Sequence, residues 1–160
     1  MKIKHMKIVF QKAQMEYLED CKAALLNSKL GEEYFPSEED TTATLTEGIQ
    51  KGEVTLALNE EGECMGFMWV IMDGAFHGYP YLHIIAVKDA FRGKGIGSRM
   101  LKFLEETILK EHSKIFLVVA DFNPDAKRLY ERVGFRRVGE IPGLYKPGVT
   151  EHLMMKERGE

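Results

Sequence analysis

Hydrophobic residues along this chain recur with two different periods, and the period predicts the type of each element. Spacings of three and four residues are typical of a helix with one buried face. They predict helices over residues 15–28, 37–50 and 99–108, and a shorter one from Pro124 through Tyr130. In the first helix, Met15, Leu18, Cys21 and Leu25 share one side, and Glu16, Glu19 and Lys22 share another. Ser37 followed by Asp40 resembles a capping box, and Gly52 marks the end of the second helix.

Alternating or continuously apolar runs predict the strands. These runs cover residues 6–10, 54–58, 65–71, 82–87, 114–120, 135–141 and 152–156, and residues 30–36 are expected to form a loop. The polar turn 59–63 predicts a hairpin between the second and third strands. Strands 82–87 and 114–120 flank a helix, which predicts a parallel pair with a right-handed crossover. The pattern therefore predicts one mixed α/β domain over residues 1–160.

Composition narrows the class of protein. The 160 residues are 44% hydrophobic, which supports a real core, and the net charge is −3. This charge gives no indication of a general nucleic-acid binder or a polybasic membrane anchor. Cys21 and Cys64 form neither a disulfide framework nor a metal spacing, so both are expected in the core. Because no signal peptide or membrane-spanning apolar run is visible, a cytoplasmic protein is expected.

The segment Arg92-Gly93-Lys94-Gly95-Ile96-Gly97-Ser98 connects a predicted strand to a predicted helix. Glycines allow a tight turn and close backbone approach, and the first amides of a helix lack an internal acceptor. With the helix dipole and the charges of Arg92 and Lys94, this segment is a candidate site for a pyrophosphate-like anion.

Two common phosphate-binding motifs do not fit this segment. A nucleoside-triphosphate loop places its Lys after the last glycine, whereas Lys94 precedes two glycines. A dinucleotide fingerprint requires a third glycine where Ser98 or Met100 stands, and the acidic residue expected about 20 positions later is missing. The spacing that does fit is R-x-x-G-x-G, filled by Arg92, Gly95 and Gly97.

A second motif follows the next predicted strand. It reads N-x-x-A-x-x-x-Y-x-x-x-G-F and is filled by Asn123, Ala126, Tyr130, Gly134 and Phe135. With both motifs in this order, the chain resembles the GCN5-related N-acetyltransferase (GNAT) superfamily, most closely over about residues 80 to 140. The resemblance implies a mixed, mostly antiparallel sheet with helices on both faces. In that fold, two splayed parallel strands hold acyl-CoA.

The resemblance also implies roles for individual residues. Acetyl-CoA would be held through the pantetheine arm by Ile85, Ala86 and Val87, through the pyrophosphate by residues 92–98, and by Asn123. Tyr130 would be the general acid at the CoA sulfur; as alternatives, Tyr130 packs its helix onto the sheet and Asn123 caps that helix. No metal is implied. Transfer would occur by direct attack in a ternary complex, because no activated Cys or Ser nucleophile accompanies the loop.

The general base is not defined by these two motifs. Many relatives use a Glu on the fourth or fifth strand, but the fifth strand here reads Leu117-Val118-Val119. The segment from Tyr81 to Val87 resembles the His-Leu-His-x-x-Ala-Val strand of arylalkylamine N-acetyltransferases, with Tyr81 replacing the first His. His83, on the same strand face as Tyr81, is therefore the base candidate; the alternative is a structural histidine.

The acceptor is left open by the sequence. Glu33 and Tyr34 on one side and Tyr145 on the other are candidates to bind an amine, which would belong to a small molecule or a peptide. An edge strand near the C-terminus would allow a homodimer. The alternative to an enzyme is an acyl-CoA-binding sensor that has no turnover.

Overall fold

The computed structural model describes residues 6–159, which form two compact units. Residues 6–70 and 84–100 belong to the first unit, and residues 71–83 and 101–159 to the second. Three elements contribute residues to both units: strand β3 (Cys64–Ala75), strand β4 (Tyr79–Val87) and helix α4 (Ile96–Ile108). Hydrogen bonds join the strands of the described chain in the order β1-β2-β3-β4-β5-β7-β6.

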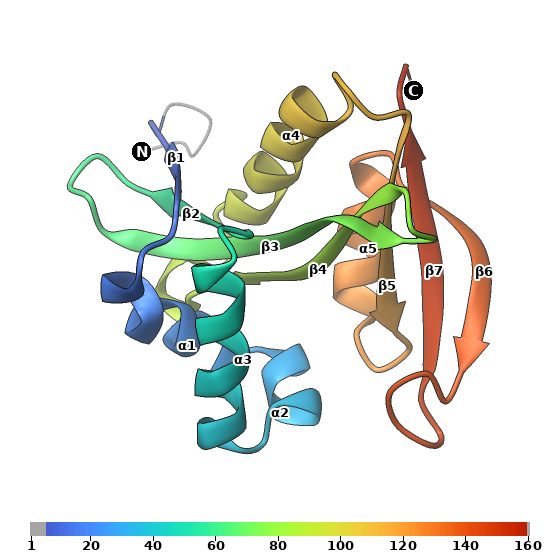
Figure 1. The fold of residues 1–160 in the computed structure, drawn as a ribbon, viewed down its shortest axis with the longest axis horizontal. Coiled ribbons are helices and arrows are strands. Elements are labelled where there is room, and N and C mark those ends of the chain that lie inside the picture. The colour runs from blue at the N-terminus through green and yellow to red at the C-terminus, as the bar shows by residue number, and fades with distance from the viewer. Residues whose placement is uncertain (1–5, 160) are drawn as a thin grey trace. The chain divides into compact units, whose positions relative to one another are not determined.

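The first unit is built on the predicted hairpin. Strand β1 (Val9–Lys12) pairs antiparallel with β2 (Val54–Leu58), which pairs antiparallel with β3. Helices α1 (Leu18–Leu26), α2 (Lys29–Tyr34) and α3 (Glu38–Gln50) lie on one side of these strands (Figure 1). The large side chains buried in its core include Leu25, Leu45, Leu56, Met65, Phe67 and Met68.

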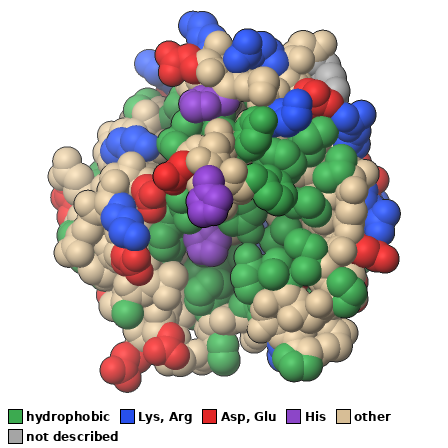
Figure 2. Space-filling view, turned by 45° about the vertical axis from the view of Figure 1, so that its right-hand side comes forward, with side chains coloured by type: hydrophobic (Ala, Val, Ile, Leu, Met, Phe, Trp, Pro, Cys, Tyr) green, Lys and Arg blue, Asp and Glu red, His purple; other side chains and the backbone are tan. Residues whose placement is uncertain are grey.

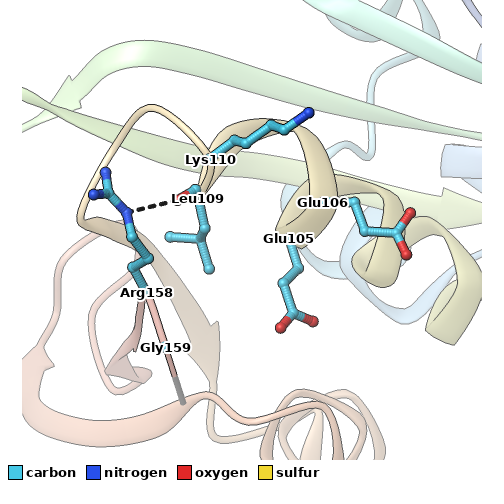
Figure 3. Close-up of a pocket in the computed structure, with 6 residues that line it drawn as sticks. All are labelled: Glu105, Glu106, Leu109, Lys110, Arg158 and Gly159. Atoms are coloured by element: carbon cyan, nitrogen blue, oxygen red, sulfur yellow. Dashed lines mark hydrogen bonds between the residues drawn. The ribbon is translucent and has the colours of Figure 1, made fainter.

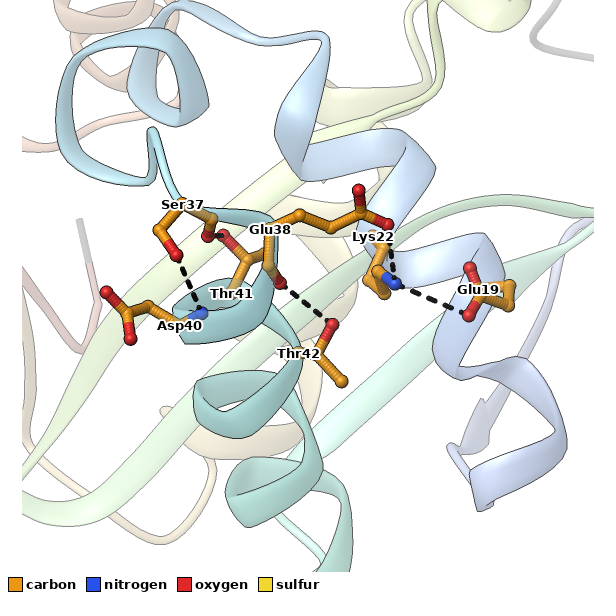
Figure 4. A network of polar contacts seen from close by, with 7 residues as sticks. All are labelled: Glu19, Lys22, Ser37, Glu38, Asp40, Thr41 and Thr42. Carbon is orange, nitrogen blue, oxygen red and sulfur yellow. Dashed lines mark hydrogen bonds and ion pairs between the residues drawn. The ribbon is translucent and has the colours of Figure 1, made fainter.

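Local polar contacts explain where α3 begins. The Ser37 hydroxyl accepts a hydrogen bond from the Asp40 amide at 3.2 Å, so Ser37 is the N-cap that the sequence predicted. The Thr41 hydroxyl donates to the Ser37 carbonyl at 2.8 Å (Figure 4). Beside this turn, the Lys22 ammonium lies 3.1 Å from Glu38 and 3.4 Å from Glu19. Lys22, which the sequence placed on the side of the helix opposite the apolar residues, is 7% exposed, and these two carboxylates compensate its charge.

Three sequence-based boundaries are corrected. Residues 30–36 were expected to be a loop, but α2 forms there because the Ser28 hydroxyl caps it by accepting from the Gly31 amide at 3.0 Å. A side chain at Gly31 would overlap the Leu25 carbonyl, so the glycine allows α2 to turn directly against α1. The first strand is Val9–Lys12 rather than residues 6–10. Met15, expected on the buried side of α1, lies in the preceding helical turn and is 42% exposed.

The second unit contains the parallel pair. Tyr81 of β4 aligns with Phe116 of β5 (Lys114–Ala120), as the predicted crossover requires. Strand β5 pairs antiparallel with β7 (Thr150–Glu157), and β7 pairs antiparallel with the edge strand β6 (Arg136–Pro142). Helix α5 (Pro124–Arg132) lies between β5 and β6 in the chain. The structure therefore confirms the mixed, mostly antiparallel α/β sheet with one parallel pair.

A buried ammonium fixes α5 in the second unit. The Lys156 Nζ donates to the Val133 carbonyl at 2.5 Å and lies 3.0 Å from a carboxylate oxygen of Glu105 on α4. The Lys156 side chain is only 7% exposed, and a Cβ at Gly134 would lie 3.0 Å from its Nζ. Gly134 also has φ of 103°, a left-handed conformation that glycine adopts without strain. The glycine of the second motif therefore leaves room for a cation at the C-terminal end of α5.

The contact between α3 and β3 gives a test of the first unit. A Cβ at Gly48 would lie 2.6 Å from the Trp69 ring, whose indole nitrogen is held at 3.1 Å by Glu53. Gly48→Ala should gain about 1 kcal/mol of helix propensity but lose about 1–3 kcal/mol to overpacking. We expect net destabilisation in a urea unfolding curve. Gly139→Ala, with no neighbouring atom within 4 Å, is the control; equal or greater stability of Gly48→Ala would contradict this packing.

Candidate functional site

The glycine loop of the first unit exposes the beginning of a helix. Gly93 and Gly95 have φ of 75° and 81°, so both occupy the left-handed region. The chain then enters α4 at Ile96, and the Arg99 amide donates to the Gly95 carbonyl at 3.2 Å. The amides of residues 96–98 precede the first helical hydrogen-bond donor and have no intrahelical acceptor. The loop therefore combines exposed backbone with the positive end of a thirteen-residue helix.

The basic side chains of this loop have structural contacts that the sequence did not predict. The Arg92 Nε donates to the Val87 carbonyl at 3.0 Å, and its Nη1 lies 3.2 Å from Asp89. Arg92 thus holds the end of β4 against the loop, besides contributing a positive charge. The Lys94 ammonium lies 5.7 Å from the centre of the Phe91 ring. Arg92 is thus engaged within the protein, whereas the amides of residues 96–98 have no acceptor within α4.

Strand β4 alternates in burial along its whole length. Tyr81, His83, Ile85 and Val87 are partly exposed, and the residues between them are buried. Tyr81 and His83 therefore share a strand face, as predicted, and their ring centres are 6.0 Å apart. Of the residues expected to hold the pantetheine arm, Ile85 and Val87 are partly exposed and Ala86 is buried.

Two phenols of the second unit are hydrogen-bonded to each other. The hydroxyls of Tyr81 and Tyr145 are 3.1 Å apart and share a hydrogen bond. Burial raises the pKa of Tyr81 far above its ordinary value, and the hydrogen bond to Tyr145 and the negative charge of Glu151 raise it further. Tyr130 also contributes to the rise in the Tyr81 pKa. Burial is thus the main cause of the raised pKa of Tyr81, and the hydrogen bond to Tyr145 is the next.

Tyr130 is buried, and its burial affects both its packing and the pKa of its phenol. It is 8% exposed, its carbonyl accepts from the Phe135 amide at 2.9 Å, and its ring meets that of Phe135 edge to face at 6.0 Å. Burial raises the pKa of Tyr130, so its phenol keeps its proton at neutral pH. Asn123 stands at the N-cap of α5, but its side chain makes no capping hydrogen bond. The expected capping role of the Asn123 side chain is therefore wrong.

Sequence reasoning missed Glu151. This residue of β7 is 2% exposed, although its neighbour His152 is partly exposed. A signal was available, because Glu151 alternates with the apolar Leu153 and Met155 and must share their strand face.

The candidate acceptor residues Glu33 and Tyr34 lie on α2 of the first unit, and Tyr145 lies in the β6–β7 loop of the second and is 53% exposed.

A hollow at the end of α4 lies apart from the residues predicted for the site. A hollow of about 380 Å³ at the end of α4 is lined by Glu105, Glu106, Leu109, Lys110, Arg158 and Gly159. There the Arg158 Nε donates to the Leu109 carbonyl at 2.8 Å, so this arginine closes the helix C-terminus (Figure 3). None of the residues predicted for the site lines this hollow.

Large apolar side chains also reach the surface of the second unit. Phe76 is 67% exposed in the turn between β3 and β4, and its ring meets the buried Phe116 edge to face at 5.2 Å. Hydrophobic side chains at the surface are green in Figure 2.

Within residues 6–159, no group of three or more His, Cys, Asp or Glu side chains is arranged to hold a metal ion. None of the helices described is long and apolar enough to cross a bilayer.

Both cysteines are buried, as expected. Burial raises the pKa of Cys64 to about 11 and raises that of Cys21 as well. Neither thiol is therefore an activated nucleophile at neutral pH.

Comparison with known proteins places these features in a family. The acetyltransferase (GNAT) family model matches residues 18–135. The blasticidin-S acetyltransferase of Streptomyces morookaense is 33% identical over 105 residues, which is 64% of this chain and 73% of that protein. The S-(2-succino)cysteine N-acetyltransferase of Bacillus subtilis is 40% identical over 85 residues, about half (51%) of each chain. A GNAT-family acetyltransferase structure from Bacillus cereus has the same fold, with a TM-score of 0.74 and 18% identity, over 96% of this chain and 99% of that one.

The phenol environments lead to a prediction. Because burial raises the pKa of both Tyr81 and Tyr130, these two should ionise above the pH at which a free tyrosine does. In a pH titration followed by NMR of ring-labelled tyrosine, Tyr81→Phe and Tyr130→Phe should each remove one late-titrating signal. Loss of a signal that titrates near pH 10, the ordinary tyrosine value, would contradict the burial of that phenol.

Proposed function

As a member of the acetyltransferase (GNAT) family, the chain is an N-acetyltransferase, and we propose that it transfers the acetyl group of acetyl-CoA to an amine by direct attack. The observation that carries this proposal is the loop of residues 92–98. Its exposed residues include two left-handed glycines directly before the N-terminus of α4, a combination that suits a pyrophosphate. Hydrogen bonds to a charged group contribute about 1.5–3 kcal/mol each, so a few amides suffice for useful affinity.

Each remaining part of the cofactor is assigned to partly exposed residues. Ile85 and Val87 of β4 would bind the pantetheine arm through their backbone, and Ala86 connects them. The Asn123 side chain, which does not cap α5, would hydrogen-bond the cofactor. Direct attack, rather than an acetylated enzyme, is supported by the buried thiols, whose raised pKa keeps them protonated.

Tyr130 is proposed to assist the leaving thiolate. Its raised pKa keeps the phenol protonated, which a hydrogen-bond donor must be. A thiolate has an ordinary pKa near 8.5, so complete proton transfer from a phenol of raised pKa would be unfavourable. Tyr130 would therefore donate a hydrogen bond to the sulfur as its negative charge develops, and would transfer its proton only as the attacking nitrogen releases one.

The base is assigned to His83. A primary amine with a pKa near 10 is mostly protonated at pH 7, and supplying its neutral form costs about 4 kcal/mol. An imidazole with an ordinary pKa near 6.5 can accept that proton. Tyr81, whose ring centre is 6.0 Å from that of His83, would continue the path through its hydroxyl to Tyr145.

The acceptor is proposed to be a small molecule bearing an amine. The names of the Streptomyces and Bacillus subtilis relatives refer to small molecules, which supports this class over a peptide. Tyr145, 53% exposed, and Glu33 and Tyr34 on α2 remain the candidates to contact the acceptor.

Two glycines with the same φ provide a test of the proposal that the loop of residues 92–98 binds the cofactor. Gly95 and Gly62 both have φ of 81°, so replacing either with Ala costs about 1–2 kcal/mol of backbone strain. Gly62 lies in the β2–β3 turn with no neighbouring atom within 4 Å. Gly95→Ala should weaken acetyl-CoA binding at least tenfold in calorimetry, whereas Gly62→Ala should bind normally. Equal affinity of the two variants would remove the loop from the cofactor site.

The catalytic proposal is tested by thiol release from acetyl-CoA across a panel of small primary amines, polyamines, amino acids and peptides. Tyr130→Phe should lower kcat by about 10²–10⁴-fold and leave the acetyl-CoA Kd unchanged, because only the hydroxyl is lost. Full activity in Tyr130→Phe would exclude the acid role. Tight acetyl-CoA binding without thiol release from any acceptor would favour a sensor instead of this enzyme.

A further inference from the structure

Lys88 is the residue at which strand β4 ends and the segment that leads to the glycine loop begins. It follows Val87, the last residue of β4, and precedes the helical turn Asp89–Phe91. Its amide donates to the Met65 carbonyl of β3 at 2.8 Å, and its carbonyl accepts from the Phe91 amide at 2.9 Å. The backbone of Lys88 therefore connects the sheet to the turn before the loop.

The side chain of Lys88 pairs with a helix that is distant in the sequence. Its ammonium donates to a carboxylate oxygen of Asp20 on α1 at 2.6 Å, although the two residues are 68 positions apart. The side chains of Lys88 and Asp20 are 21% and 34% exposed, so water and salt screen the ion pair less than an exposed one. Both partners belong to the first unit, which also contains the glycine loop.

Arg92 connects the glycine loop to the same point. Its Nε donates to the Val87 carbonyl at 3.0 Å, and its Nη1 lies 3.2 Å from Asp89, so it contacts the residues on either side of Lys88. Contacts thus run from Asp20 through Lys88 to its two neighbours, and from these to Arg92, the first residue of the R-x-x-G-x-G motif. Release of the Lys88 side chain from α1 would remove one attachment of the loop to the rest of the unit.

We propose that Lys88 is a positioning residue of the cofactor site: its ion pair with Asp20 holds the end of β4 and the glycine loop in the conformation that binds acetyl-CoA. This inference rests on the proposed function, because it concerns the binding of the same cofactor. The Lys88 ammonium is engaged by Asp20, so the residue acts through the backbone of Val87 and through Arg92, not by touching the reacting atoms. A loop that is held in place before binding loses less conformational entropy when it binds.

Two substitutions break the pair from either side. Asp20→Asn removes the negative charge at nearly constant size, and Lys88→Met removes the ammonium but keeps an unbranched side chain. In calorimetry, each should weaken acetyl-CoA binding about tenfold, because the ligand must then order the loop. In the thiol-release assay, each should raise the KM for acetyl-CoA and leave kcat and the KM for the amine nearly unchanged. Wild-type affinity for acetyl-CoA in the folded variants would overturn the proposal.

The double variant assigns the effect to the pair and not to either residue alone. Asp20→Asn combined with Lys88→Met leaves no unpaired charge, so it should bind acetyl-CoA no more weakly than the single variants do. Losses of affinity that add in the double variant would overturn the assignment to the ion pair.

Lys22 provides the matched control, because it forms an ion pair on the same helix. Its ammonium lies 3.1 Å from Glu38 of α3, and its side chain is 9% exposed, so it is more deeply buried than Lys88 (Figure 4). Lys22→Met should therefore lower the free energy of unfolding at least as much as Lys88→Met, but it should leave the acetyl-CoA Kd unchanged. Equal weakening of acetyl-CoA binding by Lys22→Met would indicate general destabilisation and would overturn the proposal.

Amide hydrogen exchange of the ligand-free protein separates this inference from the proposed function. In Asp20→Asn, the Lys88 and Phe91 amides should exchange about tenfold faster, because their hydrogen bonds open with the segment. The Ala13 amide, which donates to the Val54 carbonyl at 2.9 Å, should exchange at the wild-type rate. Unchanged exchange at Lys88 and Phe91, or equal acceleration at Ala13, would contradict the positioning role. Absence of acetyl-CoA binding by the wild-type protein would refute the proposed function alone, and the exchange rates would still decide whether the ion pair holds this segment.

Discussion

The first backbone amides of α4 impose the constraint on which the site depends. A helix cannot supply acceptors for these groups, and two left-handed glycines lead the exposed loop into the helix at Ile96. Arg92 then fixes the loop by bonding to Val87, so the amides are held in place before any ligand arrives. Preorganised donors of this kind bind an anion without paying to order themselves.

In the second unit, the buried ammonium group of Lys156 holds a helix in place. Lys156 holds the end of α5 through Val133 and Glu105, and this fixes the helix that carries Tyr130. Glu151 lies on the opposite face of the strand, and its negative charge is one of the causes that raise the pKa of Tyr81. Lys156 and Glu151 of β7 thus have side chains on opposite faces of the sheet, and burial is the main cause of the raised pKa of both Tyr81 and Tyr130.

Short-range patterns carried most of the fold prediction. The hairpin, the parallel pair and the N-cap at Ser37 follow from turn residues, alternation and spacing within one element. The failures depend on contacts between elements. The buried Lys22 ammonium, for example, is paired with Glu38, sixteen residues later in the chain and on another helix. That pairing is not visible in a local window, whereas the cap of α2 by Ser28 lies within three residues and was overlooked.

In the candidate site, too, the motifs predicted local features but not the contacts between distant residues. Both motifs predicted where the loop and Tyr130 lie, but the pairing of Tyr81 with Tyr145 joins residues 64 positions apart. Alternation with Leu153 and Met155 indicated the strand face of Glu151, and its pairing with both neighbouring strands is seen only in the structure. Contacts of Arg92 and the missing cap at Asn123 likewise required side-chain positions, which a motif does not give.

Amide NMR with two thioesters tests the central claim most directly. Acetyl-CoA and acetylpantetheine carry the same acetyl group, but only the first has a pyrophosphate. The account predicts that acetyl-CoA shifts the amide resonances of residues 95–98 strongly and that acetylpantetheine leaves them nearly unchanged. Saturating acetyl-CoA that leaves these amides unmoved would contradict the assignment of this loop as the anion site.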